Sequence, residues 1–529
     1  MAIASLVEES RAHEEGRLRL VVVAASLGTV FEWYDFFLYG SLAIFFSALF
    51  FPPGNETAAF LASLATFGAG FAVRPLGALV FGALGDRIGR KRSFLITMVI
   101  MGLATLIVGL LPTYEQVGLW APILLVTLRL AQGLAVGGEY GGAATYVAEH
   151  APPGSRGYAT SWLQTTGTIG FLMSLVVILA CRVAVGDDAF RAWGWRVPFL
   201  TSTVLLLVSV YIRLKLEESP VFEQMKLQGR ISSAPIKESF ANWNNLKRVL
   251  ITLFGITTGM TVIWYTSQFY ALFFMQGVLQ VDYKTGYAIF AIGLTIGMPL
   301  IVICGALSDR IGRKPVMVAG LLLGAVTLVP AFHALADFTN PGLVTFSRQN
   351  PITIAGAGCT FSLFAKPVSD CDRARNFFSR NGLSYTSVPG APDTGIVTTI
   401  GGTQLAGFDE ATYKKALDQA GFSAAPAAIN YAGAIMIVVW LSALIGMVYG
   451  PMAAFLVEMF PANIRATSLS LPYHLGVGIL GGFLPFAASA LVIYQGNIFA
   501  GLWYPVSIAL ATAVVGLIFL PETKDRTIS

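Results

Sequence analysis

The stretch GALGDRIGRKR, from Gly82 to Arg92, recurs with two changes as GALSDRIGRKP, from Gly305 to Pro315. Each copy joins two long apolar stretches, so a basic turn lies between segments that can span a membrane. A turn of this kind that occurs twice predicts a chain built from two related membrane halves, an arrangement found in transporters.

A second repeat supports this duplication. Glu149 is followed after seven positions by Arg156, and Glu458 is followed after seven positions by Arg465. These two pairs lie farther apart in the chain than the two basic turns do. The second half therefore carries extra residues between its basic turn and Glu458, and the polar region 337–427 fits this insertion.

The composition is that of an integral membrane protein. Of the 529 residues, 55% are hydrophobic and 12% are charged, and the mean hydropathy is +0.69. These values exclude a soluble domain of ordinary composition. A bilayer core needs about 20 apolar residues per helix. Twelve such stretches predict an all-α fold of two pseudo-symmetric six-helix bundles, with spans at 20–50, 59–84, 94–112, 119–149, 157–185, 195–213, 248–275, 286–308, 314–336, 428–457, 466–490 and 498–520.

The distribution of basic residues predicts the orientation. If the N-terminus is cytoplasmic, most Lys and Arg residues fall on the cytoplasmic side, and the short external loops hold only Arg182, Arg191 and Lys284. The positive-inside rule then places both termini in the cytoplasm of a multi-pass protein of the cell membrane. The net charge of +5 reflects this topology, so no nucleic-acid partner is expected.

These observations divide the chain into seven parts. They are a cytoplasmic N-terminus (1–19), an N-terminal bundle (20–213), a cytoplasmic central loop (214–247), helices 7 to 9 of the C-terminal bundle (248–336), the external insertion (337–427), helices 10 to 12 (428–520) and a cytoplasmic tail (521–529).

The insertion differs in composition from the rest of the chain. It has a strand-like stretch, GIVTTIGG, and a helix-like stretch, DEATYKKALDQAGF, which predict a small mixed fold between helices 9 and 10. Cys359 and Cys371 lie in it, in a compartment where a disulfide between them can persist. A cap, a docking domain for a partner and an ornament without a role in transport all remain open.

Five motifs together carry a family resemblance. They are the doubled basic turn, FEWYDFFLYG (Phe31 to Gly40), RLAQGLAVGGEYGGAATYVAEH (Arg129 to His150), EESPVF (Glu217 to Phe222) and the closing PETKDR. The chain resembles the major facilitator superfamily and, within it, the metabolite:proton symporter family, a sister of the sugar porters. The resemblance covers all but the insertion. It implies twelve helices, a central cavity and alternating access, and a protein that is not an enzyme.

The repeated charges suggest a conformational latch at the cytoplasmic side. Their carboxylates and guanidinium groups lie near helix ends and can form ion pairs that break when the halves move. A purely topological role for the charges is the alternative. The predicted latch comprises Gly82, Asp86, Arg87, Arg90, Asp309, Arg310, Arg313, Glu149, Arg156, Glu458 and Arg465.

Ionisable residues inside the predicted spans are costly, so each needs a partner or a function. Glu32, Asp35 and Tyr39 share one helix face, which should look into the cavity. The resemblance to sugar porters implies that Asp35 carries the proton and that Arg129 is its counter-charge. Burial disfavours a carboxylate and a nearby guanidinium favours it, so a change in access can load or unload a proton. Glu32 is the alternative carrier, and a purely structural role for both acids stays open.

Arg74, in FAVRPLG, can pair bidentately with a substrate carboxylate or serve as a structural partner of Glu32. His474 can titrate near neutral pH or act as a hydrogen-bonded structural residue. The other predicted substrate-binding residues are Tyr34, Gln132, Tyr140, Gln164, Trp264, Tyr265, Gln268 and Tyr473.

The sequence therefore predicts proton-coupled symport of a small organic acid, such as a di- or tricarboxylate, a keto acid or an aromatic acid. The chain has no Walker motif that would indicate ATP-driven pumping. We expect no metal site and no cofactor other than the coupling proton. The expected partners are a small metabolite and the lipid bilayer, and the fold can act as a monomer. Symport of zwitterionic osmolytes and a non-transporting sensor that uses the insertion are the alternatives.

Overall fold

The computed structural model describes residues 26–88, 90–138, 140–152, 154–214, 228, 235–356, 369–390, 395–461 and 464–527. Cys359 lies outside these residues. The first basic turn is helical, but the side chains of Asp86, Arg87 and Arg90, and Gly82 with them, lie outside the described part.

The N-terminal half consists of apolar helices, several of which break inside the predicted spans. The first helix, Ser26–Ser41, meets α2 at a bend of 61°, and a second bend of 59° lies before α11. The elements are α2 (Ala43–Phe50), α3 (Glu56–Ala72), α4 (Arg74–Ile88), α5 (Arg90–Leu110), α6 (Tyr114–Val117), α7 (Trp120–Gly137), α8 (Tyr140–His150), α9 (Arg156–Val185), α10 (Asp187–Ala189), η1 (Phe190–Gly194) and α11 (Arg196–Leu214).

The C-terminal half repeats this pattern after the short helix α13. Its first span, Trp243–Val278, is interrupted by three π-helical turns, which are often found at functional sites. The elements are α13 (Pro235–Ala241), α14 (Trp243–Thr252), η2 (Leu253–Thr257), α15 (Thr258–Tyr265), η3 (Thr266–Tyr270), α16 (Ala271–Phe273), η4 (Phe274–Val278), α17 (Tyr283–Gly297), α18 (Pro299–Ile311), α19 (Arg313–Thr339), α23 (Tyr431–Tyr449), α24 (Met452–Met459), α25 (Arg465–Leu475), η6 (Gly476–Gly481), α26 (Leu484–Gln495), η7 (Ala500–Leu502) and α27 (Trp503–Phe519).

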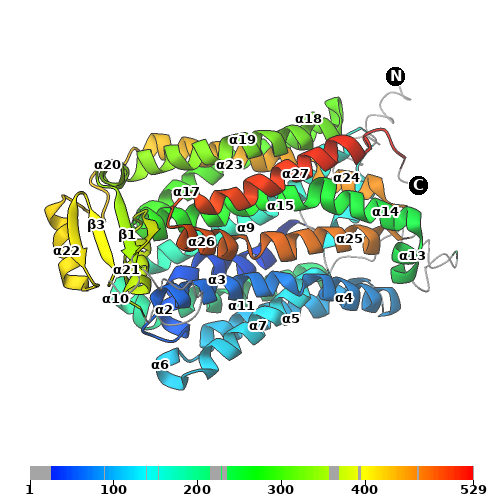
Figure 1. The fold of residues 1–529 in the computed structure, drawn as a ribbon. Coiled ribbons are helices and arrows are strands. Elements are labelled where there is room, and N and C mark those ends of the chain that lie inside the picture. Colours follow the sequence, from blue (N-terminus) through cyan, green and yellow to red (C-terminus); the bar gives the residue numbers. More distant parts are fainter. Residues whose placement is uncertain are drawn as a thin grey trace.

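The membrane architecture agrees with the sequence. Within the described residues, nine helices are long and apolar enough to cross a membrane, two bent pairs can each form one more span, and Leu95–Leu110 is a shorter apolar helix. Together they coincide with the twelve predicted spans. Figure 1 shows the helices running along one axis, with the insertion at one end and the C-terminal tail at the other. We call these the insertion end and the tail end.

The insertion is a small α/β unit, as its sequence predicts. A four-stranded sheet has the order β2-β1-β3-β4, with β1 and β2 parallel and the other neighbours antiparallel. Cys371, at the start of α21, is buried and disulfide-bonded, whereas Cys181 and Cys304 are free. The elements are α20 (Pro341–Gln349), β1 (Ile352–Gly356), α21 (Asp370–Arg380), β2 (Thr386–Pro389), β3 (Val397–Ile400), β4 (Thr403–Ala406) and α22 (Glu410–Gln419).

Glycines let two helices of the N-terminal bundle touch along their backbones. A Cβ atom added to Gly133 would clash with the carbonyl oxygen of Gly70, and one added to Gly137 would clash with the carbonyl oxygen of Arg74. Small residues at such crossings allow the close packing on which helix association in membranes depends. The Gly133 seam therefore sets the position of Arg74 relative to α7.

We predict that Gly133→Ala destabilises the bundle, because α7 and α3 must separate to admit the methyl group, a cost of about 1–3 kcal/mol for overpacking. Thermal unfolding of the purified protein in detergent measures the effect as a lower Tm. Gly142→Ala is the matched control, since nothing lies within 4 Å of a Cβ at that position. An equal Tm for both variants would contradict the close contact of α7 and α3 at Gly133.

Candidate functional site

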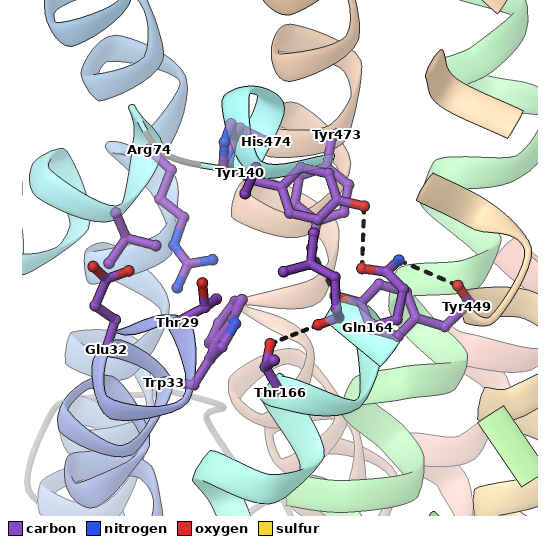
Figure 2. A pocket seen from close by; sticks show the side chains of 13 residues that line it. Thr29, Glu32, Trp33, Arg74, Tyr140, Gln164, Thr166, Tyr449, Tyr473 and His474 are labelled. Atoms are coloured by element: carbon purple, nitrogen blue, oxygen red, sulfur yellow. Dashed lines mark hydrogen bonds between the residues drawn. The ribbon is translucent and has the colours of Figure 1, made fainter. Parts of the chain in front are cut away.

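A small cavity lies between the two bundles. Its volume is about 20 Å³, which is close to the space that one water molecule needs. An organic solute therefore enters only after the bundles move apart. Figure 2 shows polar side chains from both halves around this cavity. The lining residues are Thr29, Glu32, Trp33, Arg74, Val136, Tyr140, Ala143, Leu163, Gln164, Thr166, Tyr449, Tyr473 and His474.

Arg74 is the cationic group in the cavity wall. It is the first residue of α4, its exposed fraction is 0%, and none of its three guanidinium nitrogens has a hydrogen-bond partner among the described residues. The guanidinium carbon lies 4.0 Å from the ring centre of Phe71, 4.4 Å from that of Phe36 and 5.0 Å from that of Trp33. Aromatic faces offset part of the cost of burying a cation, but they leave its N–H donors available to a ligand.

Glu32 lies in the same cavity wall as Arg74. Its exposed fraction is 7%, and its Oε1 atom has no hydrogen-bond partner within the described residues. No ion pair within 4.0 Å joins it to Arg74 in the part of the chain that the structure describes. Figure 2 shows the two side chains facing the same space. The cavity wall thus holds a carboxyl group and a guanidinium group, and each has at least one polar atom without a hydrogen-bond partner among the described residues.

Asp35 and Arg129 lie inside the N-terminal bundle, away from the cavity lining. The carboxylate of Asp35 lies beside the side chains of Thr105 and Ser202. Arg129 Nη1 donates to Gln132 Oε1 at 2.7 Å, and Gln132 Nε2 donates to the hydroxyl of Thr105 at 2.7 Å. Among the described ion pairs, none joins Asp35 directly to Arg129. The hydroxyl of Thr105 donates in turn to the carbonyl oxygen of Met101 at 3.0 Å, and Asp35 Oδ1 has no hydrogen-bond partner among the described residues.

A polar cluster from both halves forms the opposite wall of the cavity. The rings of Tyr140 and Tyr473 stack with centres 3.8 Å apart, and Tyr473 shares a 3.1 Å hydrogen bond with Tyr449. Gln164 accepts a hydrogen bond from Tyr140 and donates to the carbonyl oxygen of Tyr449 at 3.2 Å. His474 is fully buried, and neither ring nitrogen has a partner among the residues described.

The remaining predicted binding residues have other contacts. Tyr34 donates to the carbonyl oxygen of Pro198 at 2.8 Å, within the N-terminal bundle. Gln268 donates to Thr168 at 3.0 Å, which joins the bundles. Trp264 and Tyr265 pack against Phe37 and Phe71, respectively. None of these four, nor Gln132, lines the small cavity within the described structure.

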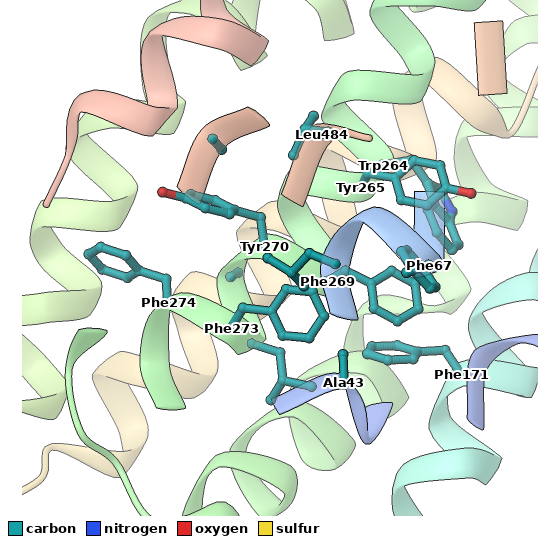
Figure 3. Packing of buried hydrophobic residues seen from close by; sticks show 14 of the residues in the cluster. Ala43, Phe67, Phe171, Trp264, Tyr265, Phe269, Tyr270, Phe273, Phe274 and Leu484 are labelled. Atoms are coloured by element: carbon teal, nitrogen blue, oxygen red, sulfur yellow. The ribbon is translucent and has the colours of Figure 1, made fainter. Parts of the chain in front are cut away.

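Aromatic rings close the passage from the cavity toward the insertion end. Phe269 of η3 lies 5.0 Å from Phe37, 4.9 Å from Phe67 and 4.6 Å from Phe171, measured between ring centres. Phe269 belongs to the C-terminal half and the other three to the N-terminal half, and Figure 3 shows Phe269 together with Phe67 and Phe171. We call these four residues the aromatic plug. It must come apart if the insertion end opens.

Ion pairs within the C-terminal half and hydrogen bonds between the halves gather at the tail end. Arg313 contacts Asp309 at 2.6 Å and Glu458 at 3.1 Å. Asp309 also accepts hydrogen bonds from the backbone N–H groups of Gly157 and Tyr158, at 2.9 and 2.7 Å. These donors form the start of α9, where a carboxylate is stabilised by free N–H groups and the helix dipole.

The second sequence repeat forms crossed contacts between the halves. Arg465 contacts Glu149 at 2.8 Å, and Arg156 lies 3.9 Å from Glu458. Each half thus supplies the acid for the base of the other half. Arg310 contributes its carbonyl oxygen, which accepts from Lys524 at 2.9 Å.

The C-terminal tail adds residues that the sequence did not single out. Glu522 accepts hydrogen bonds from the backbone N–H groups of Arg313 and Lys314, and Thr523 donates to Glu458 at 2.8 Å. Arg156 donates to the carbonyl oxygen of Arg526 at 2.8 Å. Burial acts to raise the pKa of Glu522, but its backbone N–H donors outweigh that effect and hold the pKa below its usual value.

The missed cavity residues are small or aromatic, namely Thr29, Trp33, Val136, Ala143, Leu163 and Thr166. Trp33 lies inside the FEWYD motif, next to two residues that were predicted, so its position was the available signal. The others carry no charge or spacing that distinguishes them from packing residues.

We predict that Glu522→Gln lowers the Tm by about 1–2 °C at neutral pH, a small effect because the contacts are near the surface. A carboxyl with a lowered folded-state pKa stabilises the fold above its usual pKa of 4.5 and ceases to do so as the pH falls through the lowered value. The difference in Tm between wild type and variant should therefore shrink at acid pH. Asp525→Asn is the nearby control. A difference in Tm that does not shrink as the pH falls below 4.5 would contradict this account.

The comparisons with known proteins agree with this architecture. Residues 20–239 match the family model for sugar (and other) transporters. The chain is 38% identical over 327 residues to the glycine betaine/proline/ectoine/pipecolic acid transporter OusA of Dickeya dadantii. This match covers 60% of this chain and 65% of the relative. The chain is also 36% identical over 320 residues to the alpha-ketoglutarate permease of Escherichia coli. That match covers 60% of this chain and 72% of the permease.

A solved structure shares the fold over nearly the whole length. The proton:xylose symporter XylE aligns with a TM-score of 0.62 and 17% identity, over 97% of this chain and 98% of XylE. At this identity the likeness concerns the fold alone. The permease, matched at 36% identity over more than two thirds of its length, shows that the chain belongs to the same family of membrane transporters, the major facilitator superfamily.

Proposed function

We propose that this protein is a secondary active transporter that carries a small organic acid together with a proton by alternating access. The single observation that carries the proposal is Arg74, a fully buried guanidinium in the cavity wall without a hydrogen-bond partner among the described residues. Its chemistry matches that of a carboxylate ligand.

The energetic argument concerns the burial of charge. A cation in the centre of a bilayer protein costs several kcal/mol unless it is paired. Aromatic neighbours of Arg74 supply about 2 kcal/mol when desolvated, and a bidentate carboxylate supplies directed bonds in addition. An anionic solute that enters the cavity therefore gains more from Arg74 than a neutral one does.

The closed ends support alternating access. Ion pairs close the tail end, the aromatic plug closes the insertion end, and the cavity between them is too small for a solute. A transporter of this design opens one end at a time by rocking its two halves. In the orientation predicted from basic residues, the tail end faces the cytoplasm and the insertion end faces outward.

We assign the proton to Glu32 in preference to Asp35, which the sequence favoured. Glu32 shares the cavity with Arg74, so protonation there and substrate binding act on the same local charge. Asp35 does not line the cavity, and within the described structure it forms no ion pair with Arg129. We retain Asp35 as the alternative carrier.

A zwitterionic osmolyte is the second candidate substrate. An acid and a base in one cavity, Glu32 and Arg74, can bind the two charges of such a molecule, and the relative OusA is named for betaine, proline, ectoine and pipecolic acid. The alpha-ketoglutarate permease points instead to an acid.

Transport in proteoliposomes tests the substrate class. We expect an inward proton gradient to drive accumulation of a labelled dicarboxylate or keto acid, and Arg74→Gln to reduce the initial rate at least tenfold by removing the bidentate partner. Gln164→Leu should have a smaller effect, because it removes neutral hydrogen bonds only. Accumulation of betaine or proline alone would overturn the organic-acid proposal in favour of the zwitterion.

A second transport assay tests the proton site. We predict that Glu32→Gln abolishes gradient-driven accumulation but preserves exchange of labelled for unlabelled substrate, because exchange needs no net proton movement. Asp35→Asn should retain part of the gradient-driven uptake. The reverse result would return the carrier role to Asp35.

A further inference from the structure

The insertion is attached firmly to the C-terminal half. Arg375 of α21 donates to the carbonyl oxygen of Tyr494 at 2.9 Å, and Tyr385 donates through its hydroxyl to Ile493 at 2.9 Å and through its N–H to Gly496 at 2.7 Å. These carbonyl groups lie at the end of α26. Because backbone and side-chain bonds act together here, the insertion should move with the C-terminal half.

A second anchor lies at the end of the first span of that half. Gln280, just after η4, donates to the carbonyl oxygen of Arg380 at 3.2 Å. A Cβ atom at Gly382 would clash with the carbonyl oxygen of Val278, so the chain after α21 lies directly on this helix end. Helix α21 therefore spans the ends of α26 and η4.

Among the described residues, the insertion has fewer hydrogen bonds and ion pairs with the N-terminal half than with the C-terminal half. Arg380 forms an ion pair with Glu56 at 2.8 Å, and Asn376 forms a hydrogen bond with Thr57. Within the described residues, these two side-chain contacts are the hydrogen bonds and ion pairs that join the insertion to that half. Figure 1 places α21 at the insertion end, near the ends of helices from both halves. We call these four residues the lid latch.

Two residues of the lid latch lie on the helix that carries one residue of the aromatic plug. Glu56 and Thr57 are the first residues of α3, and Phe67 of the plug follows on the same helix. When Phe67 moves away from Phe269, the start of α3 must move relative to the C-terminal half. Since the insertion is fixed to that half, the distance between Glu56 and Arg380 must grow at the same time.

We propose that the insertion is a lid that holds the insertion end closed through Glu56 and Arg380 and releases it when the halves separate. The proposal rests on the alternating access argued above. The exposed fractions of the two side chains, 72% for Glu56 and 42% for Arg380, make the ion pair weak and sensitive to salt. A weak contact suits this role, because it biases the closed state without preventing the cycle.

Spin-label distance measurements on the full chain in lipid nanodiscs test the lid. Leu119 and Tyr431 are exposed and carry the labels as cysteines, one on each half at the insertion end. Cys181 and Cys304 are replaced by Ser, and the disulfide-bonded Cys371 does not react. We expect Glu56→Arg and Arg380→Glu each to raise the ratio of long to short distances about two- to fivefold at low salt.

Two comparisons make the result specific. The double variant Glu56→Arg with Arg380→Glu rebuilds the pair with reversed charges and should return the ratio to the wild-type value. Arg373→Glu, on the same helix, breaks an exposed ion pair with Asp370 inside the insertion and should leave the ratio unchanged. In the wild type, an increase from 50 mM to 500 mM salt should raise the ratio of long to short distances, because salt screens the attraction between Glu56 and Arg380. In Arg380→Glu the same increase should lower the ratio, because salt then screens the repulsion between two carboxylates.

The distance readout does not depend on substrate or flux, so it separates the lid from the proposed transport. Unchanged ratios in the single variants, or an equal change in Arg373→Glu, would overturn the lid even if transport is observed. A shifted ratio that the double variant restores would support the lid even if no tested acid is transported. If a single variant fails to fold, the salt response of the wild type and the double variant decides.

Discussion

The buried guanidinium of Arg74 imposes the constraint on which the centre of this molecule depends. It lies in the middle of an apolar bundle, where an unpaired charge is costly, and aromatic rings of Phe71, Phe36 and Trp33 surround it. The rings stabilise the cation without using its N–H donors. Glycines along α7 allow the helix that bears Arg74 to approach closely, so the same crossing that packs the bundle also places the charge in the cavity.

The two ends of the molecule are closed by different physical means. At the tail end, the duplicated Glu and Arg residues form crossed contacts, and Asp309 binds the start of α9. At the insertion end, closure depends on apolar packing of the aromatic plug. Ring packing depends on excluded water, and at the insertion end the exposed pair of Glu56 and Arg380 adds a contact that salt weakens.

Much of the fold could be predicted because local sequence patterns indicate it. Apolar length gives the spans, the repeated turn gives the two halves, and the polar composition of 337–427 gives the insertion. The site was harder to predict, because residues at i, i+3 and i+7 share a broad helix face and only some of them reach the cavity. Glu32 lines the cavity, but Asp35 lies beside Thr105 and Ser202. The first helix is also bent by 61° before α2, which a straight helical wheel does not represent.

Contacts between distant segments were beyond the reach of sequence patterns. Nothing near Gln132 shows that it bridges Arg129 and Thr105, and nothing in PETKDR shows that Glu522 caps the start of α19. The pair of Glu56 and Arg380 joins residues that belong to different halves. Each is an ordinary polar residue whose role follows only from the position of a partner far along the chain.

The path from the cavity to the insertion follows one helix. The span Glu56–Phe81 carries the lid latch at its start, Phe67 of the plug in its middle and Arg74 in the cavity wall. Within this span α4 begins at Arg74 directly after Val73, the C-cap of α3, so a ligand that draws Arg74 toward the opposite wall should also pull on α3, which carries Phe67 and Glu56. The substrate can thus influence the lid through α3 without contacting the insertion. A coupling of this kind needs two arrangements of one rigid element and no separate signalling pathway.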